Sequence, residues 1–108
     1  MKVSVRTAAR EDILRQYRYY LVDKDAALVA EHFLNAVQAA VEALSHAPEM
    51  GSPKYFDNPL LAGLRTWPVP GFPSMRIYYI RAGSELQIVR VLHGKRDIGS
   101  LLEEDEGD

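Results

Sequence analysis

The chain of 108 residues contains no cysteine. This absence excludes a disulfide framework and a thiolate metal site. The three histidines are scattered at positions 32, 46 and 93 and do not have the spacing of a ligand set. The sequence therefore predicts no metal site, and it gives no sign of another cofactor.

Long apolar stretches are also absent. The N-terminal segment "MKVSVRTAAR" lacks the apolar run of a signal peptide. Polar residues interrupt the longest hydrophobic segment at Glu31, His32, Gln38 and Glu42. We therefore expect a soluble, cytoplasmic protein that makes no membrane contact.

Glycine and proline are missing from most of the first half of the chain. All six prolines lie between Pro48 and Pro73, and the first glycine is Gly51. Because both residue types interrupt regular structure, this shift predicts a helical half followed by a half rich in strands and turns. The length suits a single domain, which we assign to residues 1–102, followed by an acidic tail at 103–108.

Acidic residues are scarce in the second half, where only Asp57 and Glu85 lie between positions 54 and 96. The same stretch holds seven basic residues: Lys54, Arg65, Arg76, Arg81, Arg90, Lys95 and Arg96. The tail "EEDEGD" contains five of the 15 acidic residues, so residues 1–102 carry 13 basic and 10 acidic side chains, a net charge of +3. This excess indicates either a surface that binds an anionic partner or a solvated face that keeps the protein soluble.

The first half predicts a short strand followed by two helices. "KVSVR" alternates Val3 and Val5 with polar residues, as a strand with one buried face does. A helix over residues 8 to 22 follows, with Thr7 as its N-cap, Asp12 on the exposed side and Tyr19 as an exposed aromatic residue. The two helices are expected to form a helical hairpin.

The second of these helices begins after "DKD". Its apolar residues recur every three or four positions, and Asp25 is its expected N-cap. Proline cannot continue a helical ladder, so the helix is expected to end before Pro48.

The second half predicts three strands and a short final helix. The strands are "LRTWPV", "SMRIYYI" and "ELQIVRVL"; Pro68 suits an edge or a bulge, and "RAGS" suits a hairpin turn. "DIGSLLEEDE" suits one or two helical turns capped by Asp97. This order (β-α-α-β-β-β and a short C-terminal helix) predicts an α+β domain in which a helical hairpin packs on an antiparallel sheet.

The last strand carries apolar side chains on both sides. Alternation places Leu86, Ile88 and Leu92 on one face and Val89 and Val91 on the other. The hairpin covers only one face of the sheet. We therefore expect the second face to be open, with mixed apolar and basic character, and to bind a protein partner.

Two segments of the second half resemble a known family. "GLRTWPVPGFPSMRIYY" at 63–79 and "QIVRVLHGKRDI" at 87–98 are similar to the ParE branch of the RelE/ParE toxin superfamily, and the expected element order is similar as well. The resemblance implies a RelE/ParE-like fold. It also implies the toxin of a bacterial type II toxin-antitoxin system, of the kind that arrests growth and stabilises plasmids.

The resemblance further implies two protein partners. A ParE-like toxin forms a hetero-oligomer with a cognate ParD-like antitoxin that neutralises it, and it inhibits DNA gyrase by non-catalytic binding. Contact with DNA is then expected only indirectly, through the antitoxin or gyrase.

Two alternatives stay open. A RelE-like, ribosome-dependent mRNA endonuclease needs a general base and a general acid, but after Arg96 the sequence offers no aromatic residue, no histidine and no base other than carboxylates. The acidic tail would also repel RNA phosphates. An inactive homologue that only binds antitoxin is suggested by Ile80, where the family commonly has arginine, and by Arg76, where it usually has an apolar residue. We expect that the protein is not an enzyme and has no catalytic residue.

The stretch "HGKRD" joins the last strand to the final helix. Gly94 permits the turn and Asp97 accepts N–H groups at the helix start. The remaining residues are candidates for partner contact, and a local bulge is expected to bring Arg81 to the same basic surface. The candidates for contact with the target or the antitoxin are Arg65, Trp67, Arg76, Tyr78, Arg81, Arg90, His93, Lys95, Arg96 and Tyr19.

Overall fold

A computed structural model of the chain describes residues 1–96 and 98–104. The first half contains β1 (Lys2–Val5), α1 (Thr7–Arg18), a π-helical turn (Tyr19–Asp23) and α2 (Ala27–His46). The second half contains β2 (Ser52–Pro53), a 3₁₀ turn (Pro59–Leu61), β3 (Arg65–Val69), β4 (Phe72–Ala82), β5 (Glu85–His93) and α3 (Ile98–Glu104). The predicted element order is confirmed. The two-residue strand β2 was not predicted.

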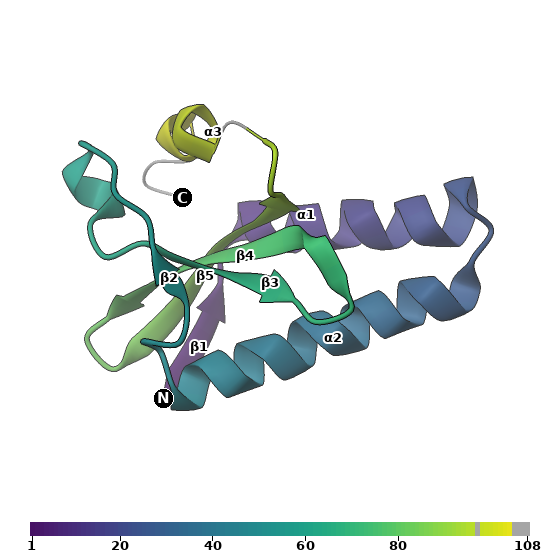
Figure 1. Ribbon diagram of the computed structural model, residues 1–108, viewed down its shortest axis with the longest axis horizontal. Helices are drawn as coiled ribbons and strands as arrows, with labels where there is room; N and C mark the ends of the chain where they lie inside the picture. The colour runs from purple at the N-terminus through teal and green to yellow at the C-terminus, as the bar shows by residue number, and fades with distance from the viewer. Residues whose placement is uncertain (97, 105–108) are drawn as a thin grey trace.

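The strands form one five-stranded sheet in the order β1-β5-β4-β3-β2. Strands β3, β4 and β5 are antiparallel neighbours, as predicted, and β2 extends this arrangement. Strand β1 instead pairs with β5 in the parallel direction, with Val3 opposite Leu86. The sheet is therefore mixed, and its first and last strands lie side by side. Figure 1 shows the hairpin of α1 and α2 on one side of the sheet and α3 on the other.

A core of aromatic and aliphatic side chains joins the hairpin to the sheet. Phe33 of α2 packs edge-on against Phe72 of β4 at a centroid distance of 5.3 Å, and Tyr20 lies 5.5 Å from Phe72. Ala30 and Ala40 are buried on the same helix, where their small side chains allow α2 to approach its neighbours closely. The predicted helical hairpin is confirmed, and helix α2 ends at His46 before Pro48, as predicted.

The opposite face of the sheet is also covered, which corrects the expectation of an open face. Ile98 and Leu102 of α3, together with Leu61 and Leu64, form a second core cluster over this face. The sheet contributes Tyr78, Ile80, Val89 and Leu92 to it. The final helix thus covers this face of the sheet, although it is short.

A β-bulge in β5 explains why the predicted faces of that strand are wrong at its C-terminal end. Tyr78 pairs with Arg90 and Tyr79 pairs with Ile88, so Val89 is the extra residue. Beyond the bulge Val91 joins the hairpin-side core, and Leu92 joins the α3-side core. Strict alternation assigned these two residues the other way round.

The expected helix caps are not found in the described structure. Helix α1 begins at Thr7 itself, and the capping position Arg6 makes no side-chain cap. Arg6 N–H donates to Ile88 O at 3.0 Å, so the β1–β5 pairing runs directly into the helix and leaves no residue for a cap. Asp25 has a φ of 47° and Ala26 takes the capping position of α2. The Asp97 cap lies outside the described residues.

None of the helices in the described part of the chain combines the length and the apolar character needed to cross a lipid bilayer.

The loop after α2 is fastened to the sheet by a buried tyrosine. Tyr79 Oη donates to Pro48 O at 2.7 Å and accepts from Gly51 N–H at 2.8 Å. Arg65 Nη1 donates to Gly51 O at 2.7 Å. Gly51 is buried against this hydroxyl, and a Cβ atom there would overlap Tyr79 Oη and lie 2.9 Å from Thr66 O. Only glycine fits at this position.

We predict that Gly51→Ala lowers the free energy of unfolding by about 2–4 kcal/mol, because the added methyl group must displace the Tyr79 hydroxyl from both of its hydrogen bonds. Denaturant unfolding measures this change. Ser52→Ala, at the exposed neighbouring position, serves as the control and should leave the midpoint unchanged. Equal stability of the two variants would show that the loop tolerates the loss of this anchor.

Candidate functional site

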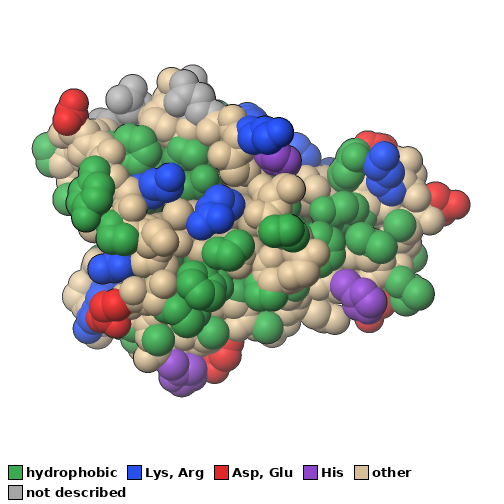
Figure 2. Space-filling view, viewed as in Figure 1, with side chains coloured by type: hydrophobic (Ala, Val, Ile, Leu, Met, Phe, Trp, Pro, Cys, Tyr) green, Lys and Arg blue, Asp and Glu red, His purple; other side chains and the backbone are tan. Residues whose placement is uncertain are grey.

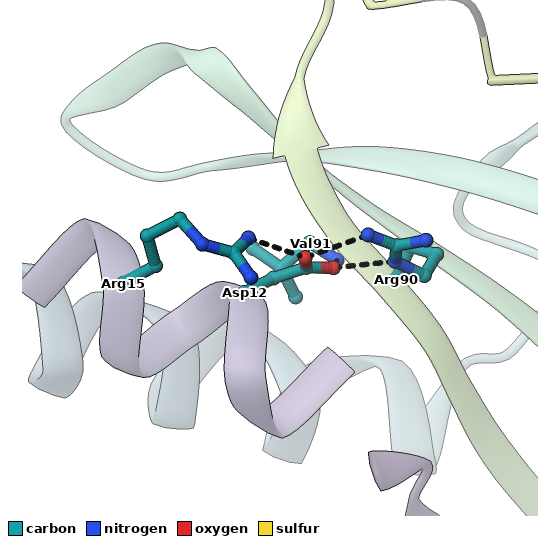
Figure 3. Close-up of polar contacts among 4 residues, drawn as sticks. All are labelled: Asp12, Arg15, Arg90 and Val91. Atoms are coloured by element: carbon teal, nitrogen blue, oxygen red, sulfur yellow. Dashed lines mark hydrogen bonds and ion pairs between the residues drawn. The ribbon is translucent and has the colours of Figure 1, made fainter. Parts of the chain in front are cut away.

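A buried carboxylate joins α1 to the exposed edge of β5. Asp12 Oδ2 accepts from Arg90 Nε at 2.7 Å and from Val91 N–H at 3.0 Å, and Asp12 Oδ1 accepts from Arg90 Nη2 at 2.8 Å. Arg15 Nη1 adds a contact of 3.3 Å (Figure 3). Strand β1 pairs with β5 only as far as Ile88. Asp12 therefore supplies the acceptor that Val91 N–H would otherwise lack.

This pair corrects two predictions made from the sequence. Asp12 was expected on the exposed side of the first helix, but its residue is only 3 % exposed. Arg90 was a candidate for partner contact, but it is 8 % exposed and its guanidinium group is bound to Asp12. Arg90 therefore has a structural role in the folded chain.

Tyr78, another candidate for partner contact, is also inside the protein. It is 2 % exposed and belongs to the α3-side core cluster. Burial raises the pKa of Tyr78, and the positive charge of Arg76 and a hydrogen bond with Thr66 offset this only in part. The phenol is therefore neutral near pH 7 and out of reach of a partner.

Arg65 and Arg81 lie at the hairpin side of the sheet, near the end of α2. Arg65 donates to the backbone carbonyls of Glu49 and Gly51, and Arg81 Nη1 forms an exposed ion pair of 3.0 Å with the Glu49 carboxylate. The expected bulge exists, but it lies in β5 and does not turn Arg81 to the other face. Ile80, one position earlier, faces the α3-side core instead. The expectation for Arg81 was therefore wrong.

Trp67 of β3 is half-buried and packs against the hairpin-side core. Tyr19 is 40 % exposed, as predicted, and Lys24 Nζ lies 5.6 Å from the centre of its ring. Tyr19 lines an open depression of about 720 Å³ along the outer side of α1, together with Leu14, Val22 and neighbouring charged residues. Leu14 and Val22 are 44 % and 68 % exposed, so this side of the hairpin presents apolar surface to solvent.

The other four candidates gather around Gly94, where β5 ends. We call Arg76, His93, Lys95 and Arg96 the basic cluster. The turn that carries it is closed by Gly94 N–H, which donates to Ser74 O at 2.7 Å, and by Arg96 N–H, which donates to His93 O at 3.0 Å. The Arg76 side chain lies against Gly94, because a Cβ atom there would be 3.2 Å from Arg76 Cδ.

The charge of the basic cluster is not balanced by a carboxylate in the described part of the chain. The ion pairs found there involve Arg15, His46, Arg81 and Arg90, and none involves the cluster. Arg76 Nε donates to Thr66 Oγ1 at 3.0 Å, a neutral partner. Figure 2 shows Lys, Arg and His side chains in the middle and at the upper margin of the side of the molecule in view, without acidic side chains between them.

His93 is placed as a donor toward solvent. Its Nδ1 atom accepts from Lys95 N–H at 3.3 Å, so in the neutral ring the proton is on Nε2. An imidazole in this tautomer offers no free acceptor nitrogen to a substrate hydroxyl. Among the described residues, no group of three or more His, Cys, Asp or Glu side chains is arranged to hold a metal ion.

Comparison with protein-family models gives a match over residues 3–98 to the ParE toxin of the type II toxin-antitoxin system, parDE. This chain belongs to the ParE toxin family. The match includes both helices of the hairpin, all five strands apart from Lys2, and the whole basic cluster. The resemblance seen in the sequence is thereby confirmed.

A ParE-like fold is also found in a solved structure described as the chromosomal ParDE TA system from P. aeruginosa. A chain of that structure has a TM-score of 0.66 to this protein, with 19 % sequence identity over 86 % of this chain and 95 % of that one. At this level of identity the likeness supports the fold alone. A search of curated proteins gives no match.

The family match ends at Ile98, the first residue of α3. The matched segment therefore includes the sheet and the turn that carries the basic cluster. The helix that covers the second core lies almost wholly beyond the matched segment.

We predict that Asp12→Asn lowers the free energy of unfolding by about 3–5 kcal/mol, because it leaves the buried Arg90 guanidinium without a counter-charge. Denaturant unfolding with a constant m-value measures the loss. Glu11→Gln removes one exposed carboxylate from the same helix and should change stability by less than about 0.5 kcal/mol. A small effect of Asp12→Asn would mean that the amide satisfies both Arg90 and Val91.

We predict that stability falls as the pH rises above about 10, because burial raises the pKa values of Tyr78 and Tyr79 in the folded state above their unfolded value. This contribution is complete below the unfolded pKa and is lost as the pH rises through the folded pKa. Denaturant unfolding at several alkaline pH values measures it. Tyr78→Phe should make the fall shallower, while Tyr55→Phe, at an exposed position, should leave its slope unchanged.

Proposed function

We propose that this ParE-family protein is a toxin that inhibits DNA gyrase by binding, without catalysis, and that a ParD-like antitoxin neutralises it. The observation that carries this proposal is a cationic surface on which the described residues place no poised general base. Arg76, Lys95 and Arg96 offer positive charge to a partner, while His93 presents a donor.

The chemistry of the face argues against RNA cleavage. A metal-free ribonuclease must remove the 2′-hydroxyl proton and protonate the leaving oxygen. Tyr78, the phenol nearest to Arg76 along β4, is buried and its pKa is raised. Tyr79 Oη is occupied by Pro48 and Gly51. The described face therefore supplies cations for a charged ligand but no poised base.

The outer side of α1 supports an antitoxin partner. Leu14, Tyr19 and Val22 are exposed along the open depression, and Arg15 and Arg18 flank them. An apolar surface bordered by cations suits an amphipathic segment with acidic flanks. The name of the P. aeruginosa structure, a ParDE system, fits a partner of this kind.

We predict that the purified protein inhibits supercoiling by DNA gyrase and increases the yield of cleaved DNA in a gyrase reaction. Agarose-gel assays of a relaxed plasmid measure both. Relaxation by a type I topoisomerase on the same plasmid is the control for DNA coating, and it should be unaffected at the same toxin concentration.

Unchanged supercoiling in the presence of folded protein would refute the gyrase proposal. The RelE-like alternative is tested separately by mapping transcripts in cells after induction of the toxin. Codon-biased cleavage of messenger RNA would contradict the non-catalytic proposal, whereas intact transcripts during growth arrest would support it.

A further inference from the structure

We infer that the basic cluster and Lys54 together form a track that binds the phosphodiester backbone of the DNA on which gyrase acts. This inference rests on the proposed function and adds a second contact to it. The resemblance to ParE implied DNA contact only through the antitoxin or gyrase. The arrangement of cations on the α3 side of the sheet indicates a direct contact.

The cations of the track lie on one face of the sheet. On β4, Arg76 alternates with Ile77 and is on the same side as Tyr78, which belongs to the α3-side core. Lys54 N–H donates to Leu64 O at 2.8 Å, and Leu64 belongs to the same core. Ser52 pairs with Thr66 at the end of the sheet, and the Lys54–Leu64 hydrogen bond continues this pairing one residue beyond β2, so alternation places Lys54 on this side as well.

The track runs across the strands. It begins at Lys54 after β2, passes Arg76 on β4 and ends at the turn after β5. Neighbouring strands are about 4.8 Å apart, and the register sets Lys54 about four residues along β4 from Arg76, so the track is oblique and about 20 Å long. One strand of DNA presents a phosphate every ~3.4 Å along the helix axis. The track is therefore long enough to meet about six phosphates.

The donors of the track have no anionic partner in the described structure. Arg76 uses Nε for Thr66, and its terminal amino groups make no other hydrogen bond there. Lys54, Lys95 and Arg96 are exposed, and none of the ion pairs between described residues engages their side chains. Guanidinium and ammonium groups with free donors are the groups that bind phosphate oxygens.

The surroundings of the track favour a phosphate backbone over an acidic protein. A protein interface usually needs a large apolar or aromatic side chain at its centre. The large apolar side chains found exposed in the described chain lie outside β3, β4 and β5. Tyr55 and Leu60 are exposed on the loop that follows Lys54, and an exposed aromatic ring beside a cation also suits stacking on an unpaired base.

Such a contact would give the toxin two anchors in a gyrase complex. Gyrase holds a DNA segment during strand passage, so a protein bound to both enzyme and DNA would dissociate more slowly than one bound to the enzyme alone. The phosphate contact carries no sequence information, so any DNA segment held by gyrase would serve.

The test compares two double variants that remove equal charge. Arg76→Gln with Lys95→Gln changes the track, and Lys2→Gln with Arg10→Gln changes exposed basic residues away from it. Fluorescence anisotropy measures binding to a labelled DNA duplex over a range of salt concentrations. The track variant should bind at least about tenfold more weakly and reduce the salt slope by about 1.8, while the control variant should match the parent protein.

The same proteins are then assayed for gyrase inhibition, and circular dichroism verifies that each is folded. Reduced DNA binding together with reduced inhibition supports the inference. Inhibition by the parent protein without detectable DNA binding overturns it and leaves the gyrase proposal standing. DNA binding without any effect on gyrase refutes the proposed function but supports the phosphate track.

Two further outcomes distinguish DNA from other anionic partners. Tighter binding of an RNA strand than of the DNA duplex would overturn the assignment to DNA. If the track variant binds DNA as well as the parent protein does, the cations serve an acidic protein or solvation, and the inference fails.

Discussion

The carboxylate of Asp12 is the contact on which the arrangement of this protein depends. Strand β1 leaves the edge of β5 after Ile88, and the chain continues directly into α1. Asp12 returns from that helix to bind Val91 N–H and the Arg90 guanidinium group. One buried side chain thus replaces a missing strand at the sheet edge and fixes the hairpin on the sheet. A buried polar group of this kind is stable only when all of its hydrogen bonds are made.

The bulge at Val89 changes which residues face each core. Because of it, Val91 faces the hairpin and Leu92 faces α3. The sheet therefore has two covered faces, one under a hairpin of two long helices and one under a short helix and a loop (Figure 1). The basic cluster lies where β5 ends, next to Leu92 of the second core. A small domain can in this way keep a core on both faces and still offer a charged surface.

The polar contacts give the arginines different roles. Arg90 is neutralised by Asp12, Arg81 by Glu49, and Arg65 is used by the loop after α2. Among the described residues, Arg76 has a hydroxyl partner, and Lys95 and Arg96 follow on an exposed turn. These three side chains therefore present positive charge at the end of the sheet where β5 ends.

The sequence by itself determined the element order, the helical hairpin and the family, because periodicity, prolines and the "PVPGF" and "VLHGKRD" segments are local signals. The parallel pairing of β1, the bulge at Val89 and the cover supplied by α3 were decided only by the tertiary structure. The same is true of the site. Arg76 and Arg90 look alike in the sequence, and only Asp12, 78 positions from Arg90, buries one and leaves the other available. Long-range contacts select among equivalent side chains, and no local pattern contains that choice.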